Sequence, residues 1–156
     1  MKQRLDSKLE EKFPNLYSTG YRVTSLKDKK YNCIAWAAKQ DQEQWWEPLK
    51  EPGCYWPSEI KPDYSFQSFV SLFEFLGYTK CSDGVHEAGF EKVAIYCDKD
   101  GEFSHVSRQL MEGPWTSKLG PEEDIEHNTP ESLVSESYGH PAVFLKRKLL
   151  HEGKIN

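Results

Sequence analysis

The sequence predicts an α+β fold in which N-terminal helices pack on a small antiparallel sheet. Two observations support this expectation: helix-favouring segments lie in the first half of the chain, and short strands separated by turn residues lie in the second half. The 156 residues suit one domain of ordinary size. We expect an N-terminal arm over residues 1–12, a single domain over 13–147 and a charged tail over 148–156.

The first expected helix begins where the sequence becomes small and apolar. Asn32 is a good N-cap, and the segment that follows it favours a helix. We therefore expect a helix that begins at Asn32 or Cys33 and ends near Gln40.

A second helix is expected over residues 66–76. Apolar side chains recur there at three-to-four spacing, Ser65 caps the start and Gly77 ends it. Between the two helices, residues 41–64 form a loop rich in Trp and Pro, and its aromatic side chains are expected to hold it against the body of the protein.

The second half of the chain has the pattern of a β-meander. Turn residues punctuate it at 98–101 and 111–114. A short extended piece is also expected near the N-terminus. The expected strands cover 21–24, 92–97, 103–110, 115–119 and 142–146.

Composition excludes several classes of function. The chain carries 20 Lys and Arg against 25 Asp and Glu, a net charge of -5, whereas a nucleic-acid binder needs a basic surface. No apolar run approaches the ~20 residues of a membrane helix. The charged N-terminus lacks the apolar core of a secretory signal. We therefore expect a cytoplasmic protein whose four cysteines are reduced.

Cys33 and His105 are the pair of residues best suited to act as a nucleophile and a base. A cysteine at a helix N-terminus is close to N–H groups that stabilise a thiolate and the oxyanion of an acyl-transfer intermediate. His105 falls on an expected strand and is the candidate base. A cysteine at a helix start that faces a histidine on a sheet is a layout suited to nucleophilic catalysis.

A third group is needed to orient the imidazole of His105. Ser117 on the neighbouring strand is our choice, but the register leaves Thr116 and Lys118 as alternatives, because successive residues of a strand face opposite sides. Asp124 and His127 are further candidates. Gln109 shares the strand face of His105 and is expected to line the same cleft.

Structural interpretations compete with each of these assignments. A free cysteine is often a small buried hydrophobe, and a histidine on a strand is often structural. Zinc ligation by Cys33, His105, Asp124 and His127 is an alternative, but the short-range ligand spacing of zinc sites is absent apart from Asp124 with His127, so we expect no metal and no cofactor. The acidic segment 121–126 is most simply a solvated face.

Several motifs resemble a family of uncharacterised bacterial proteins. They are Asn-Cys-Ile-Ala-Trp-Ala at 32–37, His-Val-Ser-Arg-Gln-Leu at 105–110 and Trp-Thr-Ser-Lys-Leu-Gly at 115–120, and the resemblance covers about residues 13–147. More distantly, the Cys-helix and the His-hairpin are similar to papain-like and NlpC/P60-like cysteine peptidases and amidases. This resemblance implies a papain-like fold with Cys33 as nucleophile, His105 as base and Asn32 or the Cys33 N–H as oxyanion donor, while Trp36 would line the cleft.

Two functions follow as expectations. The first is a cysteine hydrolase or amidase that cleaves an amide bond of a protein or peptide through the Cys33–His105 pair, and the same machinery suits a deamidase or a transglutaminase. The alternative is a non-catalytic protein-binding module, such as an immunity or adaptor protein, whose interface is the acidic and aromatic surface.

Overall fold

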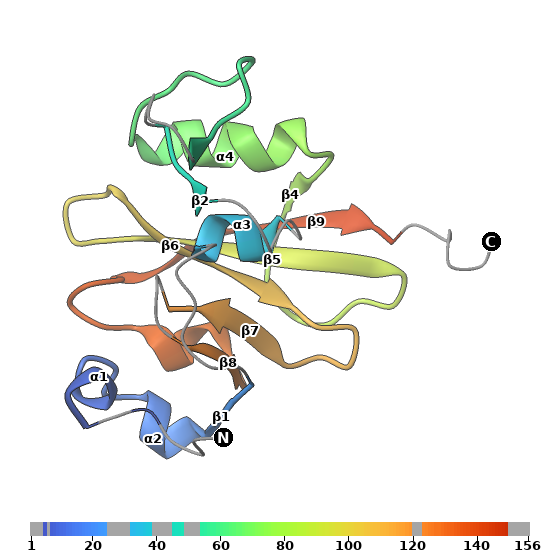
Figure 1. The fold of residues 1–156 in the computed structure, drawn as a ribbon. Coiled ribbons are helices and arrows are strands. Elements are labelled where there is room, and N and C mark those ends of the chain that lie inside the picture. The colour runs from blue at the N-terminus through green and yellow to red at the C-terminus, as the bar shows by residue number, and fades with distance from the viewer. Residues whose placement is uncertain are drawn as a thin grey trace.

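The main element of the computed structural model is a seven-stranded sheet, in which all neighbouring strands are antiparallel (Figure 1). The structure describes residues 5, 7–24, 32–38, 45–48, 54–119 and 123–149. The order across the sheet is β1-β8-β7-β6-β5-β9-β4. The strands are β1 (Tyr21–Val23), β4 (Thr79–Cys81), β5 (Phe90–Cys97), β6 (Phe103–Gln109), β7 (Trp115–Lys118), β8 (Asp124–His127) and β9 (His140–Lys148).

The described helices are short. They are α1 (Ser7–Glu11), α2 (Leu16–Thr19), α3 (Cys33–Ala37), α4 (Phe66–Phe75) and a 3-10 turn, η1 (Pro130–Leu133). Only α4 reaches 10 residues, and none of the described helices is long and apolar enough to cross a membrane.

The expected papain-like arrangement of N-terminal helices on a small sheet is wrong. The sheet dominates the fold, and α1, α2 and α3 have only four or five residues each. The physical reason is that the first helices stop after one turn, near Pro14 and Gly20, and the chain then enters the sheet as β1.

Strand alternation divides the core between the two faces of the sheet. One face packs against α3 and α4, and we call it the α4 face. The opposite face packs against the N-terminal segments and η1, and we call it the η1 face. The α4 face carries Val93, Ile95, Val106 and Leu145, whereas the η1 face carries Ala94, Tyr96, Trp115 and Ile125.

Helix starts agree with the capping residues in the sequence. The Asn32 side chain accepts the Ala35 N–H at 3.1 Å, so α3 begins at Cys33 as expected. Ser65 accepts the Ser68 N–H at 3.2 Å and caps α4. Helix α3 ends at Ala37, earlier than the expected Gln40, which lies outside the described residues.

The segment expected to be a loop contains a small parallel pair of strands, β2 (Trp45–Trp46) and β3 (Cys54–Tyr55). Trp46 is buried, and the Trp56 indole N–H donates to the Ile60 carbonyl at 3.1 Å. The Trp56 ring also meets Phe69 of α4 at 5.2 Å between centroids. Aromatic side chains therefore hold the described part of this segment against α4.

Two strands of the sheet had no counterpart in the expected pattern. Strand β4 lies at one edge beside β9, and β8 lies between β1 and β7. The acidic segment that we expected to be solvated supplies β8, and both Glu123 and Asp124 are almost fully buried. Pairing with two neighbouring strands removes this segment from water despite its charge.

We predict that Gly139→Ala destabilises the fold far more than Gly101→Ala. Both glycines have positive φ, 69° and 81°, so both substitutions incur the same backbone cost of about 1–2 kcal/mol. Only at Gly139 would the new Cβ lie 1.8 Å from a backbone oxygen, that of Cys97, whereas nothing lies within 4 Å at Gly101. Urea unfolding measures the difference, and equal losses of stability would contradict the close approach.

Candidate functional site

The hydroxyl of Ser117 joins two buried imidazoles on the η1 face. His105 Nε2 lies 3.1 Å from Ser117 Oγ, and His127 Nε2 lies 2.8 Å from the same oxygen. The register explains this contact: Arg108 pairs with Thr116 and Gln109 with Trp115, so Ser117 shares the face of His105. All three side chains are at most 1% exposed.

The hydrogen bonds around Ser117 fix the tautomers of both histidines. His127 Nδ1 lies 2.8 Å from the Thr129 carbonyl, which can only accept, so Nδ1 carries a proton. In a neutral His127, Nε2 then accepts the one proton of Ser117. His105 must therefore donate from its own Nε2 to Ser117, which leaves an unprotonated lone pair on His105 Nδ1.

Ser107 and Tyr96 extend this polar chain through the core. Ser107 Oγ lies 2.7 Å from Ser117 Oγ and 3.1 Å from Tyr96 Oη, and because Ser117 and Tyr96 donate elsewhere, its one proton serves one of these two contacts. Tyr96 in turn donates to the Pro130 carbonyl at 2.6 Å. The chain thus fastens β5, β6, β7 and β8 to the segment that leads into η1.

Burial keeps both imidazoles uncharged at neutral pH. Desolvation lowers the pKa of His127 to about 4, against the bond to Thr129, which raises it. Desolvation lowers the pKa of His105 well below its ordinary value, and the repulsion that two protonated rings would exert on each other lowers it further. Tyr138 covers the ring of His105 in a parallel stack, with 4.1 Å between the centroids.

The sulfur of Cys33 lies at the edge of β6. Its pKa responds to the N–H of Val106, the residue after His105, as well as to the N–H groups of Cys33 and Ile34 at the start of α3. Strand β6 pairs with β7 only at Arg108 and Gln109. The residues of β6 before Arg108 therefore lie at an unpaired edge, where α3 contacts the strand. The Cys33 sulfur thus contacts the backbone of the residue after His105, and the pairing of the two side chains stays a prediction.

The electrostatics of Cys33 differ from those of a thiolate nucleophile. Burial raises the pKa of the thiol to about 11, although the three N–H groups and the charge of buried Lys118 act to lower it. The helix start was expected to favour the thiolate, but α3 has only five residues, and desolvation of the sulfur outweighs it. A pKa this high leaves the Cys33 thiol protonated at neutral pH.

Cys33 and His105 approach each other from different sides of the sheet. Helix α3 packs on the α4 face, whereas the His105 ring projects into the η1 face beside Tyr96. No hydrogen bond joins the two side chains within the described part of the chain, where His105 Nδ1 is buried and has no hydrogen-bond partner. The imidazole of His105 is thus hydrogen-bonded at Nε2, whereas its buried Nδ1 has no partner among the described residues.

The residues expected at the oxyanion site and cleft separate into two places. Asn32 accepts from Ala35 and Trp46 and donates to the Trp46 carbonyl at 2.8 Å, so its amide caps and anchors α3. Trp36 donates to Thr116 Oγ1 at 3.2 Å on the same side of the sheet. Gln109 lies on the η1 face and lines a different cavity.

The zinc alternative finds no support in the described residues, where no group of three or more potential ligands meets. The other thiols are also dispersed and half-buried. The Cys97 sulfur lies 3.9 Å from His140 Nε2. Sequence reasoning gave His127 only as one of several partners, because its place beside Ser117 depends on β8, which the charge of that segment concealed.

We predict that the free energy of unfolding falls as the pH is lowered from 6.5 toward 5. In this window the unfolded chain binds protons that folded His127 does not bind until about pH 4, so acid favours unfolding. Each such histidine contributes a slope of at most about 1.4 kcal/mol per pH unit. Urea titrations should show a shallower slope for His127→Gln and an unchanged slope for His86→Gln, an exposed control.

We also predict that Cys33 reacts with iodoacetamide more slowly at pH 7 in the folded protein than in the urea-unfolded chain. A thiol whose pKa is about 11 is almost wholly protonated at that pH, and the rate should rise as the pH approaches this value. Peptide mass spectrometry resolves the four cysteines. A faster reaction of Cys33 in the folded state would show that the site ionises the sulfur.

Comparison with known proteins identifies one family. A family model described as a domain of unknown function (DUF7689) matches residues 22–146. Neither the curated proteins nor the solved structures contain a match. The expected relationship to papain-like and NlpC/P60-like enzymes therefore has no support from the comparisons. The matched region contains Cys33, His105, Ser117 and His127, and the chain belongs to the family of this domain of unknown function.

Proposed function

We propose that this chain is a thiol-dependent hydrolase or acyl transferase that acts on an amide bond of a protein or peptide, with Cys33 as nucleophile and His105 as base. The observation that carries the proposal is the lone pair on His105 Nδ1. The ring is fixed through Nε2 by Ser117 and His127, and Nδ1 has no hydrogen-bond partner among the described residues, although it is buried.

An unpartnered nitrogen in a buried polar chain has a cost in stability, which its neighbours do not share. Groups that are costly to bury in this way cluster at functional sites. A neutral imidazole is the form of histidine that can accept a proton from a nucleophile. The N–H of Val106 brings the Cys33 sulfur beside the backbone of His105. The nucleophile at the start of α3 thus lies beside the strand that carries the base.

The reaction would begin from two neutral groups. The Cys33 proton passes to His105 Nδ1 as the sulfur forms a bond to the amide carbon, and the C–N bond then breaks as the leaving nitrogen takes that proton. Water adds to the acyl-thioester and releases the acid, or an amine adds and gives a transamidated product. With a primary carboxamide as substrate, ammonia leaves and the product is a deamidated side chain.

Ser117 and His127 act in this proposal as positioning residues. They hold Nε2 of His105 as a donor, which keeps the lone pair on Nδ1. Asn32 anchors the start of α3, and the N–H groups of Cys33, Ile34 and Val106 near the sulfur supply donors for the oxyanion. Catalysis also requires the sulfur and the ring to close the remaining gap at the edge of β6.

A second candidate is a non-catalytic protein-binding module. One observation favours it: Cys33 and His105 are both uncharged, and the imidazole ring is 0% exposed beneath Tyr138. In this case the buried polar chain serves to hold four strands in register, and binding involves other surfaces of the protein.

Acyl transfer from p-nitrophenyl acetate separates the two candidates. We predict catalytic release of p-nitrophenol with one acetyl group trapped on Cys33 after acid quenching. Cys33→Ala should abolish turnover, and Cys97→Ala should retain it, because Cys97 lies on β5 away from α3. His127→Gln should lower kcat and alter its pH profile while the fold persists.

The contrary result is equally clear. Stoichiometric acetylation without turnover, or acetyl groups spread over all four cysteines, would exclude the hydrolase. Binding would then be the function to pursue.

A further inference from the structure

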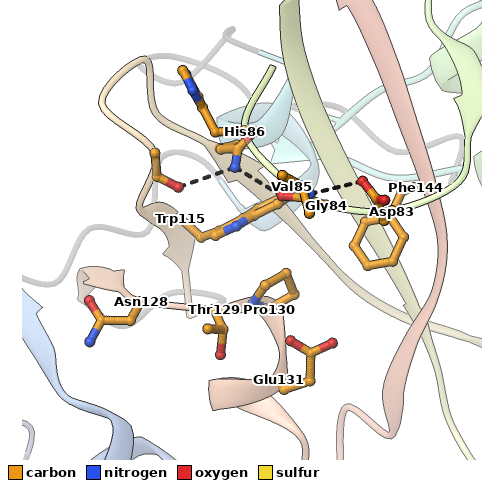
Figure 2. A pocket seen from close by; sticks show the side chains of 12 residues that line it. Asp83, Gly84, Val85, His86, Trp115, Asn128, Thr129, Pro130, Glu131 and Phe144 are labelled. Carbon is orange, nitrogen blue, oxygen red and sulfur yellow. Dashed lines mark hydrogen bonds between the residues drawn. The ribbon is translucent and has the colours of Figure 1, made fainter. Parts of the chain in front are cut away.

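A cavity of about 390 Å³ lies on the η1 face, on the side of Trp115 away from α3 (Figure 2). Its size is that of a site for a small ligand or a single side chain. The loop Asp83–His86 forms one wall and the segment Asn128–Glu131 forms the other, with Trp115 between them. The proposed thiol chemistry gives this cavity no role.

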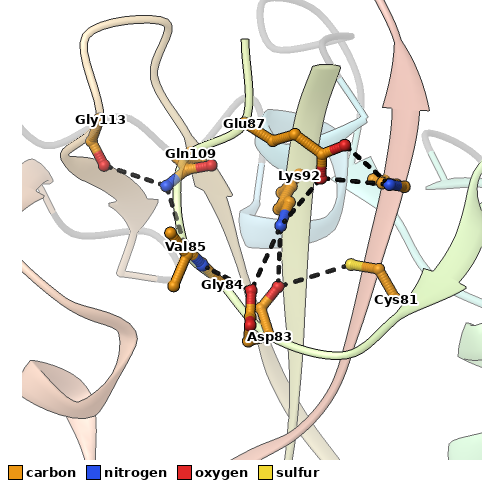
Figure 3. Close-up of polar contacts among 9 residues, drawn as sticks. Cys81, Asp83, Gly84, Val85, Glu87, Lys92, Gln109 and Gly113 are labelled. Carbon is orange, nitrogen blue, oxygen red and sulfur yellow. Dashed lines mark hydrogen bonds and ion pairs between the residues drawn. The ribbon is translucent and has the colours of Figure 1, made fainter. Parts of the chain in front are cut away.

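The first wall is held in place by two buried polar side chains. Gln109 donates its amide protons to the carbonyls of Gly84 and Gly113, each at 3.1 Å. Lys92, which is 3% exposed, donates to the Asp83 carbonyl at 3.0 Å (Figure 3). A Cβ at Gly84 would come within 2.9 Å of the Phe144 ring and 3.0 Å of the Trp115 ring, so a larger residue there would displace rings that line the cavity.

The second wall is fixed from inside the core. His127 binds the Thr129 carbonyl, and Tyr96 donates to the Pro130 carbonyl at 2.6 Å. Pro130 is itself buried. Both walls are therefore organised before any ligand arrives, which reduces the entropy cost of binding.

Two residues on different sides of the cavity, Gln109 and Glu131, offer side-chain acceptors, although the lining also includes donor side chains such as His86 and Asn128. Gln109 is 6% exposed, and because both of its donors are used, its Oε1 is the atom that remains without a hydrogen-bond partner among the described residues. Glu131 lines the opposite wall, and Figure 2 shows its carboxylate turned toward Trp115 and Phe144. An acceptor on each side calls for a ligand that donates in two directions.

Charge selects a cation among such ligands. Two carboxylates line the cavity, but Lys92 lies 3.6 Å from Asp83 and offsets its charge. Glu131 has no ion pair within the described part of the chain. A planar cation also suits the aromatic sides of the cavity, because guanidinium groups stack on aromatic rings and donate several N–H bonds.

We propose that this cavity binds a guanidinium group, with N–H donors to Gln109 Oε1 and to the carboxylate of Glu131. The shared chemistry is that of an arginine side chain in a peptide and of a small free guanidine. The site does not depend on Cys33, so it stands or falls independently of the hydrolase.

The test is titration of the ¹⁵N-labelled full chain with agmatine and with the peptide acetyl-Gly-Arg-Gly-amide. We expect a saturable shift of the Trp115 indole N–H resonance with at least one of the two probes. Binding of agmatine as tightly as the peptide would identify a free guanidine as the ligand class, and binding of the peptide alone would identify an arginine side chain. Raising the salt concentration should weaken binding, since Glu131 is exposed.

Two controls make the outcome decisive. Glu131→Gln should weaken binding about tenfold, the effect of losing one charged hydrogen bond. Glu136→Gln, which removes another exposed carboxylate outside the cavity, should leave it unchanged. The proposal is overturned if neither probe shifts the Trp115 resonance, or if the peptide with neutral citrulline in place of arginine binds equally well.

Discussion

The hydrogen bonds of the Ser117 hydroxyl determine how the rest of the core is arranged. This oxygen contacts His105, His127 and Ser107 inside a sheet face that excludes water. Each of these polar groups would be costly to bury alone, and together they satisfy one another. A slip of one residue between β6 and β7 would turn Ser117 to the α4 face and leave Nε2 of both imidazoles unpartnered, so the network and the register enforce each other.

The same burial constrains the chemistry of Cys33. A thiol with a pKa of about 11 and an imidazole with a depressed pKa do not exchange a proton spontaneously at neutral pH, so an ion pair is not the resting state. Catalysis from this arrangement would couple proton transfer to attack on the carbonyl carbon. Tyr138 lies over His105, and its own pKa is raised by burial and by the proximity of Cys33, which places all three groups close together.

Local sequence signals predicted the start of α3, the extent of α4 and the strands β5, β6 and β7 closely, because each depends on residues within a few positions. The cap at Asn32 is an example, since it contacts the third residue after it. The partnership of His105 with Ser117 was also within reach, as neighbouring strands of a hairpin must pair. The sequence could not predict whether Ser117 or its neighbours Thr116 and Lys118 share the face of His105, because this depends on the pairing of Arg108 with Thr116.

Non-local pairing explains the remaining differences. Strand β9 lies between β4 and β5, and β8 lies between β1 and β7, so these neighbours come from distant parts of the chain. The charges of Asp124 and Glu126 gave no sign that the segment would be buried between two strands. Without β8 the sequence could place neither His127 beside Ser117 nor the fold in its correct class.

The two sites meet at a pair of backbone carbonyls. Thr129 and Pro130 form a wall of the guanidinium cavity, and their carbonyls accept the protons of His127 and Tyr96 from the buried chain. A ligand that moved this wall would have to alter the bond that keeps a proton on His127 Nδ1, and with it the tautomer of His105. Because these contacts are direct hydrogen bonds, coupling between the cavity and Cys33 requires no movement of the sheet itself.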